Sequence, residues 1–188
     1  MLETNKKTDT KIGRTRREGL AMFRIGDLVV HPMHGAGVID DIVRERVAGS
    51  TKEYYVFKMP MGGLVLKIPT ENSQAIGIRP VITAEEADAL LNAVSSIKPE
   101  HNANWNKRYQ ENLLRLKSGD LYEVAQVVKG LMHRDAVRGL STGERKMLHS
   151  AKQIMLSELA LVLECDYKAV EMRLDRAMME KTAALPKP

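Results

Sequence analysis

The sequence is poor in cysteine and in aromatic residues, and it has no long hydrophobic run. Cys165 is the one cysteine among 188 residues, which excludes an internal disulfide framework and favours a reducing compartment. No apolar run approaches the roughly 18 residues that a membrane span needs. Residues 1–22 lack the apolar core of a secretory signal. We therefore expect a cytoplasmic protein that does not associate with membranes.

Motifs for catalysis or metal binding are also missing. His31 and His34 are close in sequence, but no cysteine or carboxylate cluster near them completes a metal site. The run from His133 to Asp135 is similar to a kinase catalytic loop, yet no glycine-rich phosphate loop accompanies it. The segment 61–63 lacks the lysine of a phosphate loop and indicates a turn instead. We predict no catalytic residue, no metal and no cofactor, so the protein is not expected to be an enzyme.

The net charge of +5 comes from 29 basic and 24 acidic residues and is distributed unevenly. Residues 1–22 carry six basic and three acidic residues, and we interpret them as a flexible polar arm. In the second half, residues 98–117 and 129–152 carry net charges of +3 and +4, while 83–97 and 118–128 carry −3 and −2. This segregation favours a local basic face on a nearly neutral domain.

Short β-type runs fill the part of the chain from Phe23 to about residue 80. They cover residues 25–32, 35–43, 52–59, 64–69 and 75–78, with glycine, proline and asparagine between them. No connection is long enough for a crossover helix, so parallel pairing is excluded. Five short strands in about 60 residues predict a small antiparallel β-barrel. Residues 64–68 form an apolar strand that carries Lys67 and is either a core strand or an edge available for pairing.

The hydrophobic period becomes helical after residue 80, which predicts an α+β protein of two domains. Capping boxes begin at Thr83 and Ser141, and Asp120 is a third candidate cap. We expect a bundle of about five helices, over residues 83–94, 104–117, 120–138, 141–164 and 167–180. The predicted domains are therefore an arm (1–22), a β domain (23–80), a helical domain (81–182) and a tail (183–188).

Trp105 is the one tryptophan, and two interpretations of it remain open. At about 100° per residue, Trp105, Tyr109 and Leu116 share a helix face, which favours a core position. However, Trp105 lies in the first helical turn after Asn104, and Lys107 and Arg108 follow it. This arrangement also suits an exposed aromatic wedge beside phosphate-binding cations.

The chain from Phe23 to about residue 180 resembles the CarD/CdnL family of bacterial transcription regulators. Three motifs carry the resemblance. They are FRIGDLVVHP with HGAG at 23–37, NWNKRY with LKSGD at 104–120, and RGLSTGERKML at 138–148. Residues 52–54 and 64–69 extend the first. That first motif is also similar to the polymerase-binding module of transcription-repair coupling factors, but those are long helicases without this helical half.

The resemblance implies a function and a set of site residues. A Tudor-like barrel would dock on the RNA polymerase β subunit by extending a sheet edge, and the helical domain would lie on promoter DNA upstream of the −10 element. Trp105 would enter the minor groove at the upstream edge of the bubble, without sequence reading. The residues assigned to DNA are Asn104, Trp105, Lys107, Arg108, Arg145 and Lys146, and those assigned to polymerase are Arg46, Leu64, Val65, Leu66 and Lys67.

Two further expectations accompany the resemblance. The chain departs from the pattern at Glu45, where some relatives carry an arginine that aids docking, although Arg44 and Arg46 flank the position. The protein is expected to act as a monomer that reaches the nucleoid through polymerase. The alternative function is a protein-docking adaptor, in which the helical domain binds a protein partner and Trp105 belongs to the core.

Overall fold

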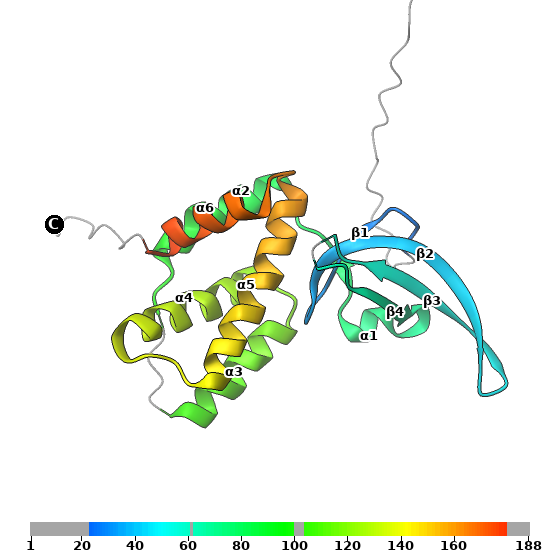
Figure 1. The fold of residues 1–188 in the computed structure, drawn as a ribbon, viewed down its shortest axis with the longest axis horizontal. Helices are drawn as coiled ribbons and strands as arrows, with labels where there is room; N and C mark the ends of the chain where they lie inside the picture. Colours follow the sequence, from blue (N-terminus) through cyan, green and yellow to red (C-terminus); the bar gives the residue numbers. More distant parts are fainter. Residues whose placement is uncertain (1–22, 61, 100–103, 180–188) are drawn as a thin grey trace, which may run out of the picture.

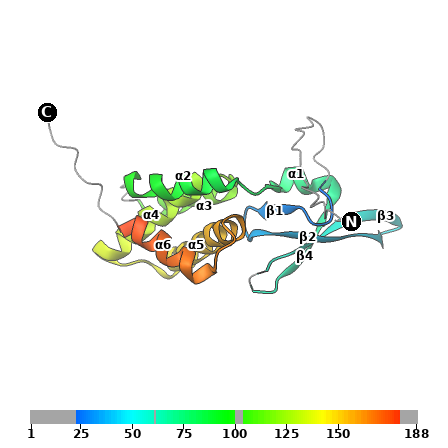
Figure 2. The same cartoon turned by 90° about the horizontal axis from the view of Figure 1, so that it is seen from above.

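The computed structural model describes residues 23–60, 62–99 and 104–179, which form a β domain followed by a helical domain (Figure 1). The predicted arm and the predicted tail lie outside the described residues. The α+β layout expected from the sequence is confirmed. The two domains lie side by side, and helix α5 (Thr142–Val162) is next to strands β1 (Leu28–His31) and β2 (Gly35–Val47) (Figure 2).

The β domain is one five-stranded antiparallel sheet in the order β4-β3-β2-β1-β5. The remaining strands are β3 (Ser50–Lys58), β4 (Val65–Pro69) and β5 (Arg79–Pro80). Ala48 and Gly49 have φ values of 50° and 85°, which suits the tight turn between β2 and β3. β4 and β5 pair on one side only, so each is an edge of the sheet among the described residues.

Inward-facing side chains of alternating strand positions build the core of the β domain. Phe57 and Ile39 are fully buried there, together with Val29, Tyr55, Met59 and Ile68. Gly37 is required because a Cβ at this position would lie 2.7 Å from the Phe57 ring and 2.5 Å from the Lys58 carbonyl oxygen. Glycine therefore allows β2 to cross directly over the largest core residue.

The prediction of a fifth strand at residues 75–78 is wrong. Residues 70–72 form the 3₁₀ turn η1 and Ser73–Ile76 form the short helix α1, which ends at Gly77 with φ of 89°. The fifth strand is Arg79–Pro80 and pairs with β1 over two residues. Isoleucine at 76 and 78 produced the β-like pattern, but a four-residue helix is too short for its period to be recognised.

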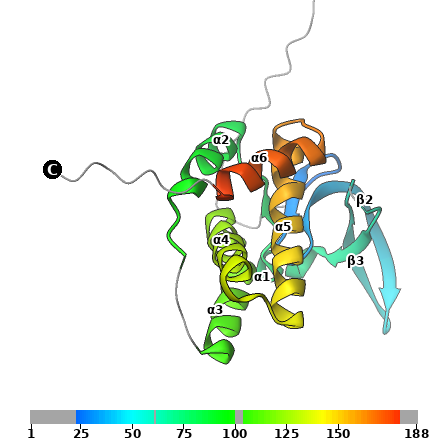
Figure 3. The same ribbon diagram turned by 60° about the vertical axis from the view of Figure 1, so that its left-hand side comes forward.

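The helical domain contains α2 (Ala84–Ala93), the 3₁₀ turn η2 (Val94–Ser96), α3 (Trp105–Lys117), α4 (Leu121–Arg138), α5 and α6 (Tyr167–Met179). The five long helices agree with the prediction to within a few residues. Both capping boxes are present, at Thr83 with Glu86 and at Ser141 with Glu144, and Asp120 caps α4. α5 lies between the other helices and the β domain (Figure 3), and its residues Ala151, Met155, Leu156 and Leu159 are buried. None of the helices in the described ranges is long and apolar enough to cross a membrane.

Candidate functional site

Trp105 is partly exposed at the start of α3 and is not a core residue. The residue is 44% exposed to solvent. One face of the indole stacks on Tyr109, with ring centroids 5.2 Å apart and an interplanar angle of 23°. The indole Nε1 donates a hydrogen bond of 3.2 Å to Ser141 Oγ at the start of α5. The ring is therefore anchored at one face and one edge, while much of its remaining surface is exposed.

A buried ion-pair network lies beside the tryptophan. Glu144 is 2% exposed, and its Oε1 accepts hydrogen bonds from Arg108 Nε at 2.9 Å and from Nη2 at 2.6 Å. The other carboxylate oxygen accepts from the Ser141 backbone N–H and hydroxyl. Burial alone would raise the pKa of Glu144, but the bonds from Arg108 and Ser141 outweigh it and hold the pKa below its ordinary value. The network connects α3 to the start of α5.

Two helix N-termini meet at Trp105, since Asn104 caps α3 and Ser141 caps α5. Backbone N–H groups at a helix start carry partial positive charge and attract anions. The first turn of α3 contains no acidic residue, and the acidic residue in the first turn of α5 is the buried Glu144. The surface around the exposed indole is therefore favourable for the negative charge of a phosphate backbone.

The predicted DNA-contacting cations divide into two groups. The Lys107 side chain is 69% exposed and lies 3.8 Å from Glu111, and Arg145 and Lys146 are exposed in the first turn of α5. These three lie in the first turns of the two helices whose N-termini flank Trp105. Arg108, in contrast, is 8% exposed and directed into the bundle toward Glu144. Lys107 and Arg108, which the sequence analysis had assigned to the same role, thus differ in the structure. Lys107 is exposed, and Arg108 is paired with Glu144 inside the bundle.

The second predicted site is strand β4, one edge of the sheet. Val65 is 52% exposed, Leu64 just before the strand is 39% exposed, and Leu66 is half-buried against the core. Because β3 covers only one side of β4, the outer backbone groups of this strand remain available for a further strand. Exposed apolar side chains at an open edge are typical of a surface for pairing with a partner's strand.

Lys67 lies in the middle of β4, and its ammonium group contacts the carboxylate of Glu45 on β2. The Lys67 and Glu45 side chains are 52% and 41% exposed, so solvent screens this pair. Arg46 follows Glu45 and is exposed near the β2–β3 turn. Glu45 is thus paired with the lysine predicted to bind polymerase.

The two histidines His31 and His34 lie close together at the end of β1 and just after it. The His31 and His34 rings lie 4.5 Å apart, and no group of three potential ligands occurs among the described residues. Burial and the charge of His34 lower the pKa of His31 from 6.5 to about 4. His31 Nδ1 accepts a hydrogen bond from the Met33 backbone N–H, which requires an unprotonated Nδ1. The neutral ring is therefore a structural element at the end of β1.

Sequence reasoning missed the link between Ser141 and Trp105, and it missed Arg134, whose Nε lies 3.4 Å from Glu144 Oε1. The capping box identified Ser141 and Glu144 as helix-starting residues. It gave no indication that they also contact α3, because residues 36 positions apart are related only by the tertiary fold. The available signal in the sequence was an acidic residue, Glu144, within the basic segment 129–152.

The sequence was compared with known proteins. Residues 23–82 match the family model described as "CarD-like/TRCF RID domain", and residues 89–175 match the model described as "CarD, C-terminal domain". A relative from Bacillus subtilis (strain 168), named "Putative transcription factor YdeB", is 33% identical over 141 residues. That alignment covers 75% of this chain and 92% of the relative. Since both halves match in the order that the fold shows, the chain belongs to the CarD family of transcription regulators.

Proposed function

We propose that the protein docks as a monomer on the RNA polymerase β subunit through strand β4 and stabilises the promoter open complex through Trp105. The observation that carries this proposal is the indole itself, which is anchored yet 44% exposed. A core tryptophan would be closed to solvent, so the exposure of Trp105 supports the wedge over a core position. An aromatic ring bordered by helix N-termini and cations suits a wedge at a melted base step.

The mechanism is a shift of equilibrium. A protein that binds open promoter DNA better than closed DNA favours opening by the difference between its two binding free energies. Stacking of one base on an aromatic side chain contributes about 1–3 kcal/mol, or roughly a fivefold to hundredfold change in the equilibrium. The cations Lys107, Arg145 and Lys146 would contact phosphates without reading sequence. With so few cations, binding to free DNA is expected to be weak, and docking on polymerase supplies the effective concentration.

The central test measures the lifetime of open complexes with and without the protein. Trp105→Ala should remain folded, because the ring is not in the core, and should lose the extension of the lifetime. Leu114→Ala is the matched control, since Leu114 is an apolar residue of the same helix that is 69% exposed. Equal lifetimes with wild-type protein and Trp105→Ala would refute the wedge. They would favour instead an adaptor whose helical domain binds another protein.

Docking is tested separately by measuring binding to purified polymerase. Lys67→Glu reverses the charge at the centre of the open edge and should weaken binding. The control is Lys168→Glu, which makes the same change at an exposed position on α6 in the helical domain. If both variants bind as tightly as the wild type, β4 is not the docking strand.

A further inference from the structure

We propose that Arg79 and Glu158 are positioning residues that clamp the two domains together and thereby fix the location of Trp105 relative to strand β4. The inference rests on the proposed function, because it concerns the spacing between the two proposed contact surfaces. It adds the statement that the protein acts as a rigid spacer. The clamp is defined by Arg79, Glu158 and the nearby pair Ala36 and Ser157.

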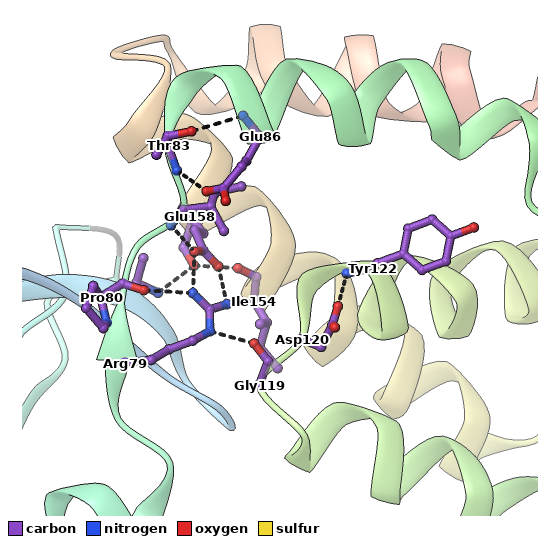
Figure 4. Close-up of polar contacts among 12 residues, drawn as sticks. Arg79, Pro80, Thr83, Glu86, Gly119, Asp120, Tyr122, Ile154 and Glu158 are labelled. Atoms are coloured by element: carbon purple, nitrogen blue, oxygen red, sulfur yellow. Dashed lines mark hydrogen bonds and ion pairs between the residues drawn. The ribbon is translucent and has the colours of Figure 1, made fainter. Parts of the chain in front are cut away.

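Arg79 and Glu158 join the domains through a bidentate ion pair (Figure 4). Arg79, on the edge strand β5, places Nη1 and Nη2 at 2.6 and 2.8 Å from the two carboxylate oxygens of Glu158 on α5. Glu158 is fully buried, and its Oε1 also accepts the Ile82 backbone N–H at 2.9 Å. A buried charge without its partner is costly, so this carboxylate strongly favours the docked arrangement. Two parallel N–H···O bonds also fix orientation, which one lysine contact would not do.

A second contact lies beside the first and restricts rotation about it. Ser157 Oγ accepts a hydrogen bond of 2.9 Å from the Ala36 backbone N–H at the start of β2. Gly35 lets the chain approach, because a Cβ there would lie 2.2 Å from the Ser157 hydroxyl and 3.3 Å from the backbone of Ile154. Two neighbouring α5 residues are thus held by two different strands, and such a pair of contacts opposes hinge motion.

The clamp acts on both helices that form the Trp105 site. Arg79 Nε donates a hydrogen bond of 2.6 Å to the carbonyl oxygen of Gly119, just after the C-terminal end of α3. Trp105 is the first residue of that helix. Along α5, Glu158 lies near one end and Ser141, the hydrogen-bond partner of the indole, caps the other. Arg79 therefore contacts the C-terminal ends of α3 and α5, whereas the Trp105 site lies at the N-terminal ends of the same two helices.

The helix lengths show why this matters. At 1.5 Å per residue, the α5 segment between Ser141 and Glu158 is about 25 Å long. A rotation of about 10° at the clamp would then move the Trp105 site by roughly 4 Å. One base step along a strand is about 3.4 Å, so even this small rotation would displace the ring by a whole step. Rigid docking is thus required for a wedge that must enter one defined base step.

The first experiment measures domain geometry in the full chain. Spin labels are placed on the native exposed Cys165 and on Lys58→Cys in β3, and the distance distribution is recorded. We expect one narrow distribution in the otherwise wild-type protein and a broadened one after Glu158→Gln. Asp175→Asn is the matched control, because it removes a 2.6 Å ion pair to Lys152 of the same helix α5 but within the helical domain. An equally narrow distribution in Glu158→Gln overturns the clamp.

Two further variants keep the test decisive if Glu158→Gln does not fold. Arg79→Gln removes the charge from the β5 side and leaves both hydrophobic cores intact. Ser157→Ala removes only the hydroxyl that accepts the Ala36 N–H, so it is the mildest change. Broadening in the folded variants supports the clamp, whereas narrow distributions in both overturn it.

The second experiment measures open-complex lifetime at saturating protein. Linking two binding surfaces raises the apparent affinity about 10²–10⁴-fold. We therefore expect loosening of the domain interface in Glu158→Gln to reduce the lifetime extension on the order of tenfold. Binding to polymerase alone should change less than about twofold, since β4 is untouched. If the wild type does not extend the lifetime, the proposed function fails while the distance measurement still decides the clamp. If Glu158→Gln is broadened yet extends the lifetime as the wild type does, the inference fails and the function stands.

Discussion

Arg108 and Lys107 are adjacent in sequence, and the structure predicts opposite consequences for their removal. Arg108→Met keeps the length of the side chain but removes the charge that faces Glu144 at 2.6 Å. The two side chains are 10% and 3% exposed, so solvent cannot replace the lost partner. Removing one member of a buried pair costs about 3–5 kcal/mol.

The cost at this site should lie at the lower end of that range. Arg134 remains 3.4 Å from Glu144, and Ser141 continues to donate to the same carboxylate. We therefore expect Arg108→Met to lower the free energy of unfolding by about 3 kcal/mol. For a protein of this size the melting temperature should fall by roughly 6–12 °C. Lys107→Met should change stability by less than about 0.5 kcal/mol, because its side chain is 69% exposed.

Urea denaturation followed by circular dichroism measures both variants. A double-mutant cycle with Glu144→Gln then separates the pair from other effects, and the double variant should cost less than the sum of the two single variants. A loss below about 1 kcal/mol for Arg108→Met would refute the reasoning, since a buried carboxylate that has lost its main charged partner cannot be so inexpensive. In the lifetime assay, Lys107→Met should reduce the effect of the protein while its stability stays unchanged.

Three further predictions concern the β domain. Stability should fall by about 1–2 kcal/mol as pH drops from 6.5 to about 4, because unfolded His31 binds a proton that the folded ring rejects, while solvent around the half-buried ring reduces the full effect of the pKa shift. His31→Gln should flatten this pH profile of urea unfolding. Gly37→Ala should destabilise the domain by about 2–3 kcal/mol in thermal unfolding, because its Cβ would meet a backbone oxygen at 2.5 Å. Glu45→Gln releases Lys67 from its exposed ion pair and should strengthen polymerase binding. The gain should be up to about fivefold, because the pair contributes at most about 1 kcal/mol. Weaker binding would contradict the assignment of Lys67 to the polymerase-binding strand.

The order of elements was predictable wherever a pattern was long or carried its own end signal. Two capping boxes and the Asp120 cap located three helix starts within a residue or two. The segment 73–80 was not predictable, because a one-turn helix and a two-residue strand are too short to show a period. Arg79 in this segment contacts Gly119 and Glu158, which are 40 and 79 residues away and therefore unrelated to it by any local pattern.

Only some of the residues of the candidate site could be predicted from the sequence. Trp105 and the exposed Lys107 were identified from position in a first turn, but periodicity favoured a core tryptophan. Whether a helix face is covered depends on what packs against it. Trp105 meets the start of α5 at Ser141, yet the residue stays 44% exposed. The burial of Arg108 depends on Glu144, which is 36 residues away, so its role could be read only from the fold.

The open edge at β4 also affects whether copies of the protein associate with one another. Unpaired strand edges readily recruit identical strands and lead to aggregation. β4 has five residues, ends at Pro69, which has no N–H to donate, and carries a lysine at its centre. A second copy arriving in register antiparallel would bring one Lys67 near another, and the proline would interrupt the ladder. The strand can therefore accept a partner with complementary charge while it resists self-association.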